Sequence, residues 1–175
     1  MRQSILRYFI SLLLVSLCIC SATSIFIISG SMKEDSEREM MYSVKLIEYN
    51  LDYSGDLNKQ IETLNPLAFS DDTRISVIDE KGKVLADTYK DDISSNHIKR
   101  EEVQEALHSS NHEGYAMRRS ETTNQPLLYA AYYKDNHIIR LSIPYSGVWG
   151  YFPELAPAFA ISILISILFS YIVAR

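Results

Sequence analysis

The sequence has only two cysteines among its 175 residues, Cys18 and Cys20, and both lie in an uncharged stretch near the N-terminus. The polar middle of the chain therefore has none, which excludes a disulfide bond there. Its six glycines include no glycine-rich run of the kind that cradles phosphates. The middle segment has to fold around its own apolar core, which about 120 residues can supply.

Charge is absent from two long stretches, 8–32 and 155–174, and all 22 acidic residues lie between them. A helix of 20 residues is about 30 Å long, which matches the hydrocarbon core of a bilayer. We expect transmembrane helices at 8–30 and 153–174. The first apolar stretch is longer than the roughly 7–15 apolar residues of a secretory signal, which favours an uncleaved anchor.

Three basic residues, Arg2, Arg7 and Arg175, flank the outer ends of these two stretches without an acidic neighbour. The positive-inside rule then places both chain ends in the cytoplasm. The predicted organisation is a cytoplasmic N-terminus at 1–7, an extracytoplasmic domain at 31–150 and the start of a cytoplasmic part at 175. This describes a multi-pass protein of the plasma membrane that has membrane lipid as a partner.

Apolar residues recur at helical spacing in the segment 31–53, which predicts a helix that continues out of the membrane. The stripe has two interpretations, a face that packs on the domain's own sheet or a seam between two copies of the chain. Its members are Met40, Val44, Ile47 and Leu51. Shorter helices are predicted at 56–64 and 100–108, with breaks at Asn65-Pro66 and around Ser109.

A period of two residues replaces the helical period in the rest of the domain and predicts strands. The expected strands are 74–79, 84–86, 115–120, 127–133 and 137–143. The order of helix, short helix, two strands, helix and three strands predicts an α+β fold, with helices packed against a five-stranded antiparallel sheet.

Four segments resemble, in order and spacing, the PAS-like (PDC, or single Cache) extracytoplasmic sensor domains of bacterial histidine kinases. They read VIDEKGKVLAD at 77–87, REEVQEAL at 100–107, RRSET followed by LYAA within 118–131, and IRLSIP at 139–144. The resemblance is nearest to phosphate-responsive sensor kinases of Gram-positive bacteria. It implies a PAS-like sheet with a long N-terminal helix, and extracytoplasmic signal sensing by a homodimer that forms the input half of a two-component kinase.

A kinase core needs a cytoplasmic phosphoacceptor histidine, but all four histidines lie between the two uncharged stretches. This chain therefore carries no catalytic residues, and we expect the kinase core, with its contact to a response regulator, beyond Arg175. We expect no cofactor and no nucleic-acid partner. Two alternatives stay open: a membrane-anchored dimerisation or protein-interaction module without a small ligand, and the sensor of a chemoreceptor or nucleotide cyclase.

The candidate ligand-binding residues are Arg118, Tyr129 and Tyr132. Arg118 and Arg119 are adjacent on a predicted strand and point to opposite faces. A guanidinium can hold an anion through two parallel hydrogen bonds, and the tyrosines would line the pocket. The alternatives are a surface arginine paired with an acid and tyrosines that only pack in the sheet.

The signal itself is unknown, either a small ligand or an envelope protein. Amine-binding Cache domains typically have an aspartate after their strand tyrosine, where this chain has Ala130 and Ala131, so an amino-acid ligand is not expected. His108 and His112 have the spacing of a metal pair, but Ser109 to Asn111 should end the helix between them. No metal site is expected.

The absence of cysteine from the domain generates a first prediction. Residues 33–150, expressed alone, should fold without metal or disulfide, because the predicted sheet and helices supply an apolar core. Circular dichroism should show mixed helix and strand with one cooperative thermal transition that EDTA and a reducing agent leave unchanged. A fragment that melts without cooperativity would contradict this prediction.

Overall fold

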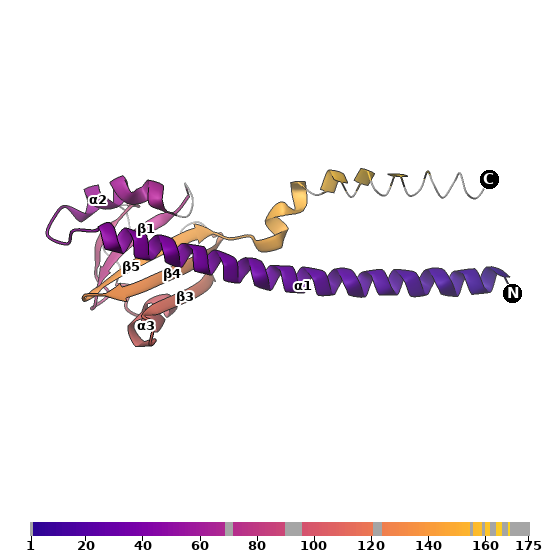
Figure 1. Ribbon diagram of the computed structural model, residues 1–175, viewed down its shortest axis with the longest axis horizontal. Helices are drawn as coiled ribbons and strands as arrows, with labels where there is room; N and C mark the ends of the chain where they lie inside the picture. The colour runs from indigo at the N-terminus through magenta and orange to yellow at the C-terminus, as the bar shows by residue number, and fades with distance from the viewer. Residues whose placement is uncertain are drawn as a thin grey trace. The chain divides into compact units, whose positions relative to one another are not determined.

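The computed structural model describes residues 2–68, 72–89, 96–120 and 124–154, together with 156–158, 160–161, 164–165 and 168. The chain divides into two compact units, one formed by Glu34–Tyr145 and the other by the remaining N- and C-terminal residues. A single helix, α1 (Arg2–Asn50), begins in the terminal unit and ends in the unit Glu34–Tyr145 (Figure 1). The helix predicted to end at 53 therefore ends three residues earlier.

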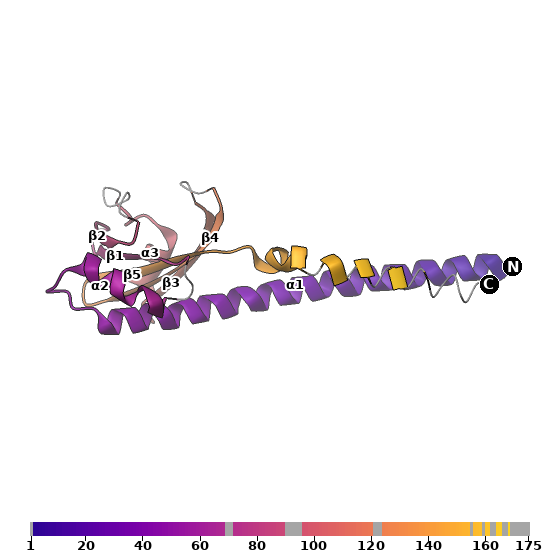
Figure 2. The same ribbon diagram turned by 90° about the horizontal axis from the view of Figure 1, so that it is seen from above.

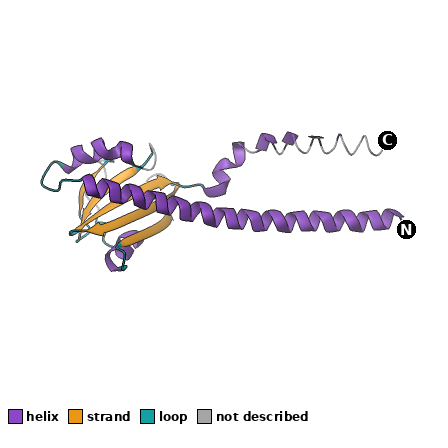
Figure 3. Cartoon of the chain, viewed as in Figure 1, coloured by secondary structure: helices purple, strands orange, loops and turns teal. Residues whose placement is uncertain are grey.

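Five antiparallel strands form one sheet in the order β2-β1-β5-β4-β3 (Figure 3). This confirms the predicted α+β class and the predicted sheet. The central strand, β5, pairs with β1 on one side and with β4 on the other. The strands are β1 (Arg74–Asp79), β2 (Val84–Asp87), β3 (Glu113–Arg119), β4 (Pro126–Lys134) and β5 (His137–Pro144).

The hairpin between β4 and β5 closes through the two residues Asp135 and Asn136, which have φ angles of 48° and 65°. Asp and Asn tolerate this left-handed backbone better than most residues, and two-residue hairpins favour it because it matches the twist of the strands. The turn pairs Lys134 with His137 and fixes the register of the two strands.

One face of the sheet is covered by the end of α1. Met40, Val44 and Ile47 are fully buried there, and Leu51, just beyond the helix, packs against the same cluster. The strands contribute apolar residues at alternating positions, namely Ile75, Val77, Leu128, Ala130, Ile139, Leu141 and Ile143. The stripe thus packs on the sheet of its own chain, so any seam between copies would have to use another face of α1.

Two ion pairs join α1 to the strands on one side of the sheet. The Lys45 ammonium lies 2.5 Å from a Glu113 oxygen in β3, and the Lys134 ammonium of β4 lies 2.8 Å from a Glu48 oxygen. Partly exposed pairs of this kind add little stability by themselves. They connect α1 with β3 and β4.

Two further helices complete the domain. In α2 (Leu57–Leu64), the Asp56 carboxylate caps the first turn by accepting a hydrogen bond from the Lys59 N–H, and a short 3₁₀ turn, η1 (Asn65–Leu67), follows. The helix α3 (Glu101–His108) packs on the face of the sheet opposite α1, where Val103 and Ala106 meet Ile78, Ala131 and Ile138 (Figure 2).

The residues after β5 include a short 3₁₀ turn, η3 (Gly147–Tyr151). Most of the helix predicted at 153–174 falls outside the described residues. A search of the described residues finds no helix with the length and apolar character that crossing a membrane requires. The two spans therefore stay predictions.

Candidate functional site in a buried charged face of the sheet

The face of the sheet opposite α1 carries polar and charged side chains that solvent barely reaches. Six such residues are at most 4% exposed: Ser76, Asp87, His97, Glu102, Arg140 and Ser142. Burying charge costs folding free energy even when the charges are paired, and an apolar face would pack at lower cost. A charged cluster of this kind in an otherwise apolar domain is a candidate functional site.

Arg118, on β3, binds the carboxylate of Glu102, which lies on the first turn of α3. The two terminal nitrogens of the guanidinium donate to the two carboxylate oxygens at 2.5 and 3.0 Å. The same guanidinium lies 3.6 Å from the ring centre of Tyr129, in the range of a cation–π contact. Burial lowers the pKa of Arg118, but the hydrogen bond and charge of Glu102 outweigh it, so the pKa is raised overall.

A glycine allows Glu102 to reach this position. A Cβ atom on Gly114 of β3 would lie 2.0 Å from the backbone oxygen of Glu102 and 2.6 Å from the backbone nitrogen of Ala106. Only a residue without a side chain lets α3 rest so closely on the strand. The close approach places the Glu102 side chain over the sheet.

Arg140 lies at the centre of the cluster, on the central strand β5. Its guanidinium donates to Nδ1 of His97 at 2.8 Å and to the Ser76 hydroxyl at 3.0 Å. Because a guanidinium has only donors, Nδ1 of His97 must accept and carries no proton. Burial lowers the pKa of Arg140, and the nearby charge of Glu102 opposes that effect.

The hydrogen bonds of Arg140 come from its two terminal nitrogens and not from Nε. Its nearest carboxylate oxygen, on Glu102, lies 3.6 Å from Nη1, which is long for a hydrogen bond. Within the described part of the chain, the Nε–H group has no hydrogen-bond acceptor although it is buried.

Asp87 closes the other end of the cluster. It accepts hydrogen bonds from Nε and Nη2 of Arg74, at 2.9 and 3.0 Å, and from the Ser76 hydroxyl at 2.8 Å. Oδ1 of Asp87, the oxygen that accepts from Nε of Arg74, also accepts from the backbone N–H of Tyr89. A chain of polar contacts thus crosses the sheet, and in order it contains Arg74, Asp87, Ser76, Arg140, Glu102 and Arg118.

The structure brings together two of the three predicted ligand-binding residues. Arg118 and Tyr129 lie on the charged face, whereas Tyr132 lies on the face covered by α1, with the Lys45 ammonium 5.2 Å from its ring centre. Residues three apart on a strand point to opposite faces, so Tyr129 and Tyr132 cannot line one pocket. The expectation that they do so is corrected, while ligand binding itself stays a prediction.

Sequence reasoning missed the residues that connect the cluster, above all Glu102 and Arg140. One signal was present in the pattern of β5, where Arg140 stands between Ile139 and Leu141. A charged residue inside a strand that is central and covered on both faces has to be buried and paired. Recognising it required knowing that this strand is central, which depends on the sheet order.

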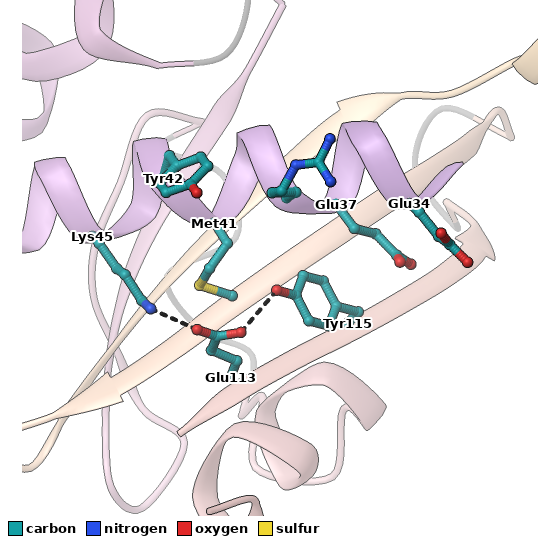
Figure 4. Close-up of a pocket in the computed structure, with 8 residues that line it drawn as sticks. Glu34, Glu37, Met41, Tyr42, Lys45, Glu113 and Tyr115 are labelled. Atoms are coloured by element: carbon teal, nitrogen blue, oxygen red, sulfur yellow. Dashed lines mark hydrogen bonds and ion pairs between the residues drawn. The ribbon is translucent and has the colours of Figure 1, made fainter. Parts of the chain in front are cut away.

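A second candidate is a groove of about 330 Å³ between α1 and the edge strand β3 (Figure 4). Glu113 lies in it and accepts hydrogen bonds from the Lys45 ammonium and, at 3.0 Å, from the Tyr115 hydroxyl. Burial, followed by the hydrogen bond and charge of Glu113, raises the pKa of Tyr115. Among the residues described, no three His, Cys, Asp or Glu side chains are placed to hold a metal ion. The groove is the weaker candidate, because its central carboxylate is already engaged.

No protein-family model and no curated protein matches the sequence. Among solved structures, a methyl-accepting chemotaxis protein from Vibrio parahaemolyticus aligns over 70% of this chain and 97% of its own, with a TM-score of 0.51 and 16% identity. The ligand-binding domain of the Campylobacter jejuni chemoreceptor Tlp3, in complex with 4-methylisoleucine, aligns over 69% of this chain, with a TM-score of 0.49 and 17% identity. The Bacillus subtilis YkuI protein, which has an EAL domain, aligns over 73% of this chain, with a TM-score of 0.48 and 16% identity.

This chain covers 36% of the YkuI chain and 55% of the Tlp3 domain. At these identities the Vibrio match shows the fold alone. The chain has an α+β fold with a long N-terminal helix and a five-stranded antiparallel sheet, and it shares this fold with the Vibrio structure.

The cluster generates a second prediction. Asp87→Ala should lower the free energy of unfolding by about 3–5 kcal/mol, because it removes the buried partner of Arg74 and the acceptor of Ser76. The control is Asp35→Ala, which breaks the exposed pair with Arg38 and should cost less than about 1 kcal/mol. Urea unfolding of the full chain in detergent micelles, followed by fluorescence, measures both values. Equal losses for the two variants would contradict the assignment.

Proposed function

We propose that the chain is the extracytoplasmic input part of a membrane receptor, and that the charged face of its sheet responds to the signal. The observation that carries the proposal is the chain of polar contacts from Arg74 to Arg118, which links the four strands β1, β2, β3 and β5 with α3. A domain of this size gains no stability from such a cluster over an apolar face. The fold that it shares with the Vibrio chemotaxis protein agrees with a sensory role.

The central strand offers a route by which the signal reaches α1. On β5, Arg140 faces the charged cluster, while its neighbours Ile139 and Leu141 pack in the core that includes Met40 and Val44 of α1. A change in the hydrogen-bond partners of Arg140 therefore shifts the position of β5, the strand whose other face packs against α1. A ligand can shift such an equilibrium by its differential affinity for the two arrangements, typically about 1–3 kcal/mol.

The proposal includes two membrane spans, at 8–30 and 153–174, with the domain outside the plasma membrane. Its support is the absence of charge from the two stretches and the position of the flanking arginines. The four matching segments favour a histidine kinase as the parent, with the kinase core and the contact to a response regulator beyond Arg175. The Vibrio match favours a chemoreceptor as the alternative parent.

We also propose that the chain acts as a homodimer, through the face of α1 that lies away from the sheet. Tyr42, Leu46 and Tyr49 recur at helical spacing there and are 68%, 45% and 81% exposed. Large apolar side chains in one exposed stripe indicate an interaction surface, and two identical helices can pack along such a stripe. The same stripe favours the second candidate function, an assembly module that binds no small ligand.

Signalling through Arg140 can be tested without knowing the ligand. In a chimera that joins residues 1–175 to the core of a histidine kinase, Arg140→Met should change basal autophosphorylation in membrane vesicles at least about threefold, since 1 kcal/mol of coupling shifts an equilibrium about fivefold. The control, Arg119→Gln, alters an exposed residue outside the cluster and should leave activity unchanged. Equal basal activity of a folded Arg140→Met chimera and its parent would contradict the signalling role.

The dimer interface can be tested by crosslinking. In a chain whose Cys18 and Cys20 are replaced by serine, Leu46→Cys should form a disulfide-linked dimer when membranes are oxidised. Val44→Cys is the matched control, because its side chain is buried against the sheet and should not crosslink. Crosslinking of neither variant, or of both equally, would contradict the proposed interface.

A further inference from the structure

The segment that follows β5 presents large aromatic side chains to its surroundings. Trp149, Tyr151 and Phe152 are 69%, 53% and 55% exposed, and they lie within the turn η3 and directly after it. We call these three residues the aromatic turn. Large apolar side chains that gather on one short exposed segment indicate a surface that binds a partner.

Two glycines shape the backbone of the aromatic turn. Gly147 has a φ of 54°, a left-handed conformation that glycine adopts without strain. A Cβ atom on Gly150 would lie too close to the hydroxyl of Ser146, which favours a residue without a side chain there. The Phe152 N–H donates to the Trp149 carbonyl, and the centres of the two rings are 6.3 Å apart. The sequence thus builds a tight turn that keeps its rings together.

Charge is absent around the aromatic turn. No acidic or basic residue occurs from 141 to 153, and the uncharged stretch 155–174 begins directly after Glu154. An interface with a soluble protein typically has a polar rim, which this stretch does not supply. Tryptophan and tyrosine combine an apolar ring with a hydrogen-bonding group, and they are enriched where membrane lipid meets water. The composition therefore favours lipid as the partner.

The position of the turn in the chain agrees with this choice. The residues from Ser146 onward belong, with Met1–Lys33, to the compact unit that contains both predicted spans, and not to the unit Glu34–Tyr145. Pro153 follows the rings directly and is suited to the first turn of a helix. The aromatic turn therefore stands where the second span is predicted to begin.

We propose that the aromatic turn binds the phospholipid headgroup layer of the outer leaflet, with the rings of Trp149, Tyr151 and Phe152 inserted among the lipids. This inference rests on the membrane topology in the proposed function. It goes beyond that topology because it assigns a lipid-binding surface to residues that precede the second span.

The lipid contact fixes the outer end of one span and not of the other. The first predicted span ends at 30, and no aromatic residue occurs between Phe26 and Tyr42. Its outer end therefore has no rings of the kind that favour the headgroup layer. The second span is held at its depth more firmly than the first.

The single tryptophan of the chain reports the position of the turn directly, because it is Trp149 itself. The full chain is reconstituted in vesicles of phosphatidylcholine and phosphatidylglycerol. Part of the phosphatidylcholine carries bromine, a contact quencher of tryptophan fluorescence, either near the headgroup or near the ends of the acyl chains. Bromine near the headgroup should quench Trp149 at least about twofold more than bromine near the chain ends, since the ring lies at the interface.

Two variants that move the tryptophan serve as controls. Trp149→Phe combined with Tyr49→Trp puts the probe near the end of α1, at a position that is 81% exposed, and neither brominated lipid should quench it. Trp149→Phe combined with Phe26→Trp puts the probe inside the first predicted span, and the brominated lipids should quench it.

Trp149 fluorescence that neither lipid quenches overturns the inference, whether acrylamide reaches the ring from water or a protein contact shields it. Stronger quenching by bromine near the chain ends overturns it as well, because the ring would then lie in the hydrocarbon core. If the probe at position 26 is still quenched, the membrane topology stands and only the lipid contact of the turn fails. If that probe is not quenched either, both proposals fail.

Discussion

The positive charge of Arg140, held inside the sheet, is the constraint on which the rest of this domain depends. An arginine stays charged at any accessible pH, so its neighbours have to be arranged around it. The Ser76 hydroxyl and Nδ1 of His97 accept hydrogen bonds from it, and a carboxylate oxygen of Glu102 lies 3.6 Å away. The strand that carries Ser76 is also paired with β5 along its whole length.

The two faces of the sheet differ in the kind of contact that their side chains make. Under α1 the contacts are apolar, close-packed and insensitive to small molecules in solution. Under α3 an apolar cluster around Val103 and Ala106 lies beside hydrogen bonds between charged groups, which depend on direction. The alternation of residues along β5 joins both faces to one backbone.

The fold could be predicted from the sequence because its signals are local. Apolar residues at helical spacing placed the sheet-covering stripe on α1, and alternation placed Ile139 and Leu141 on one face of a strand. The end of α1 was less accurate, since Leu51 continues the apolar pattern although the helix stops at Asn50. Periodicity reports which side chains are buried and not where the backbone leaves the helix.

The candidate site was only half predictable, because its residues come from separate segments. Arg118 and Tyr129 could be named from their types, but Tyr132 could not be separated from Tyr129 without applying the period of the strand. Glu102 reads as an ordinary acid in the first turn of a helix, where acids are favoured for local reasons. That it lies against Arg118 follows from the packing of α3 over Gly114, which no local pattern contains.

The most direct test of the responsive charged face observes the Nε–H group of Arg140 itself. In ¹⁵N-labelled full-length chain, its NMR signal can be assigned by comparison with an Arg140→Lys variant. We expect a proton shift typical of a group without a hydrogen bond, because the Nε–H has no acceptor among the described residues. A signal typical of a strong hydrogen bond would contradict this assignment.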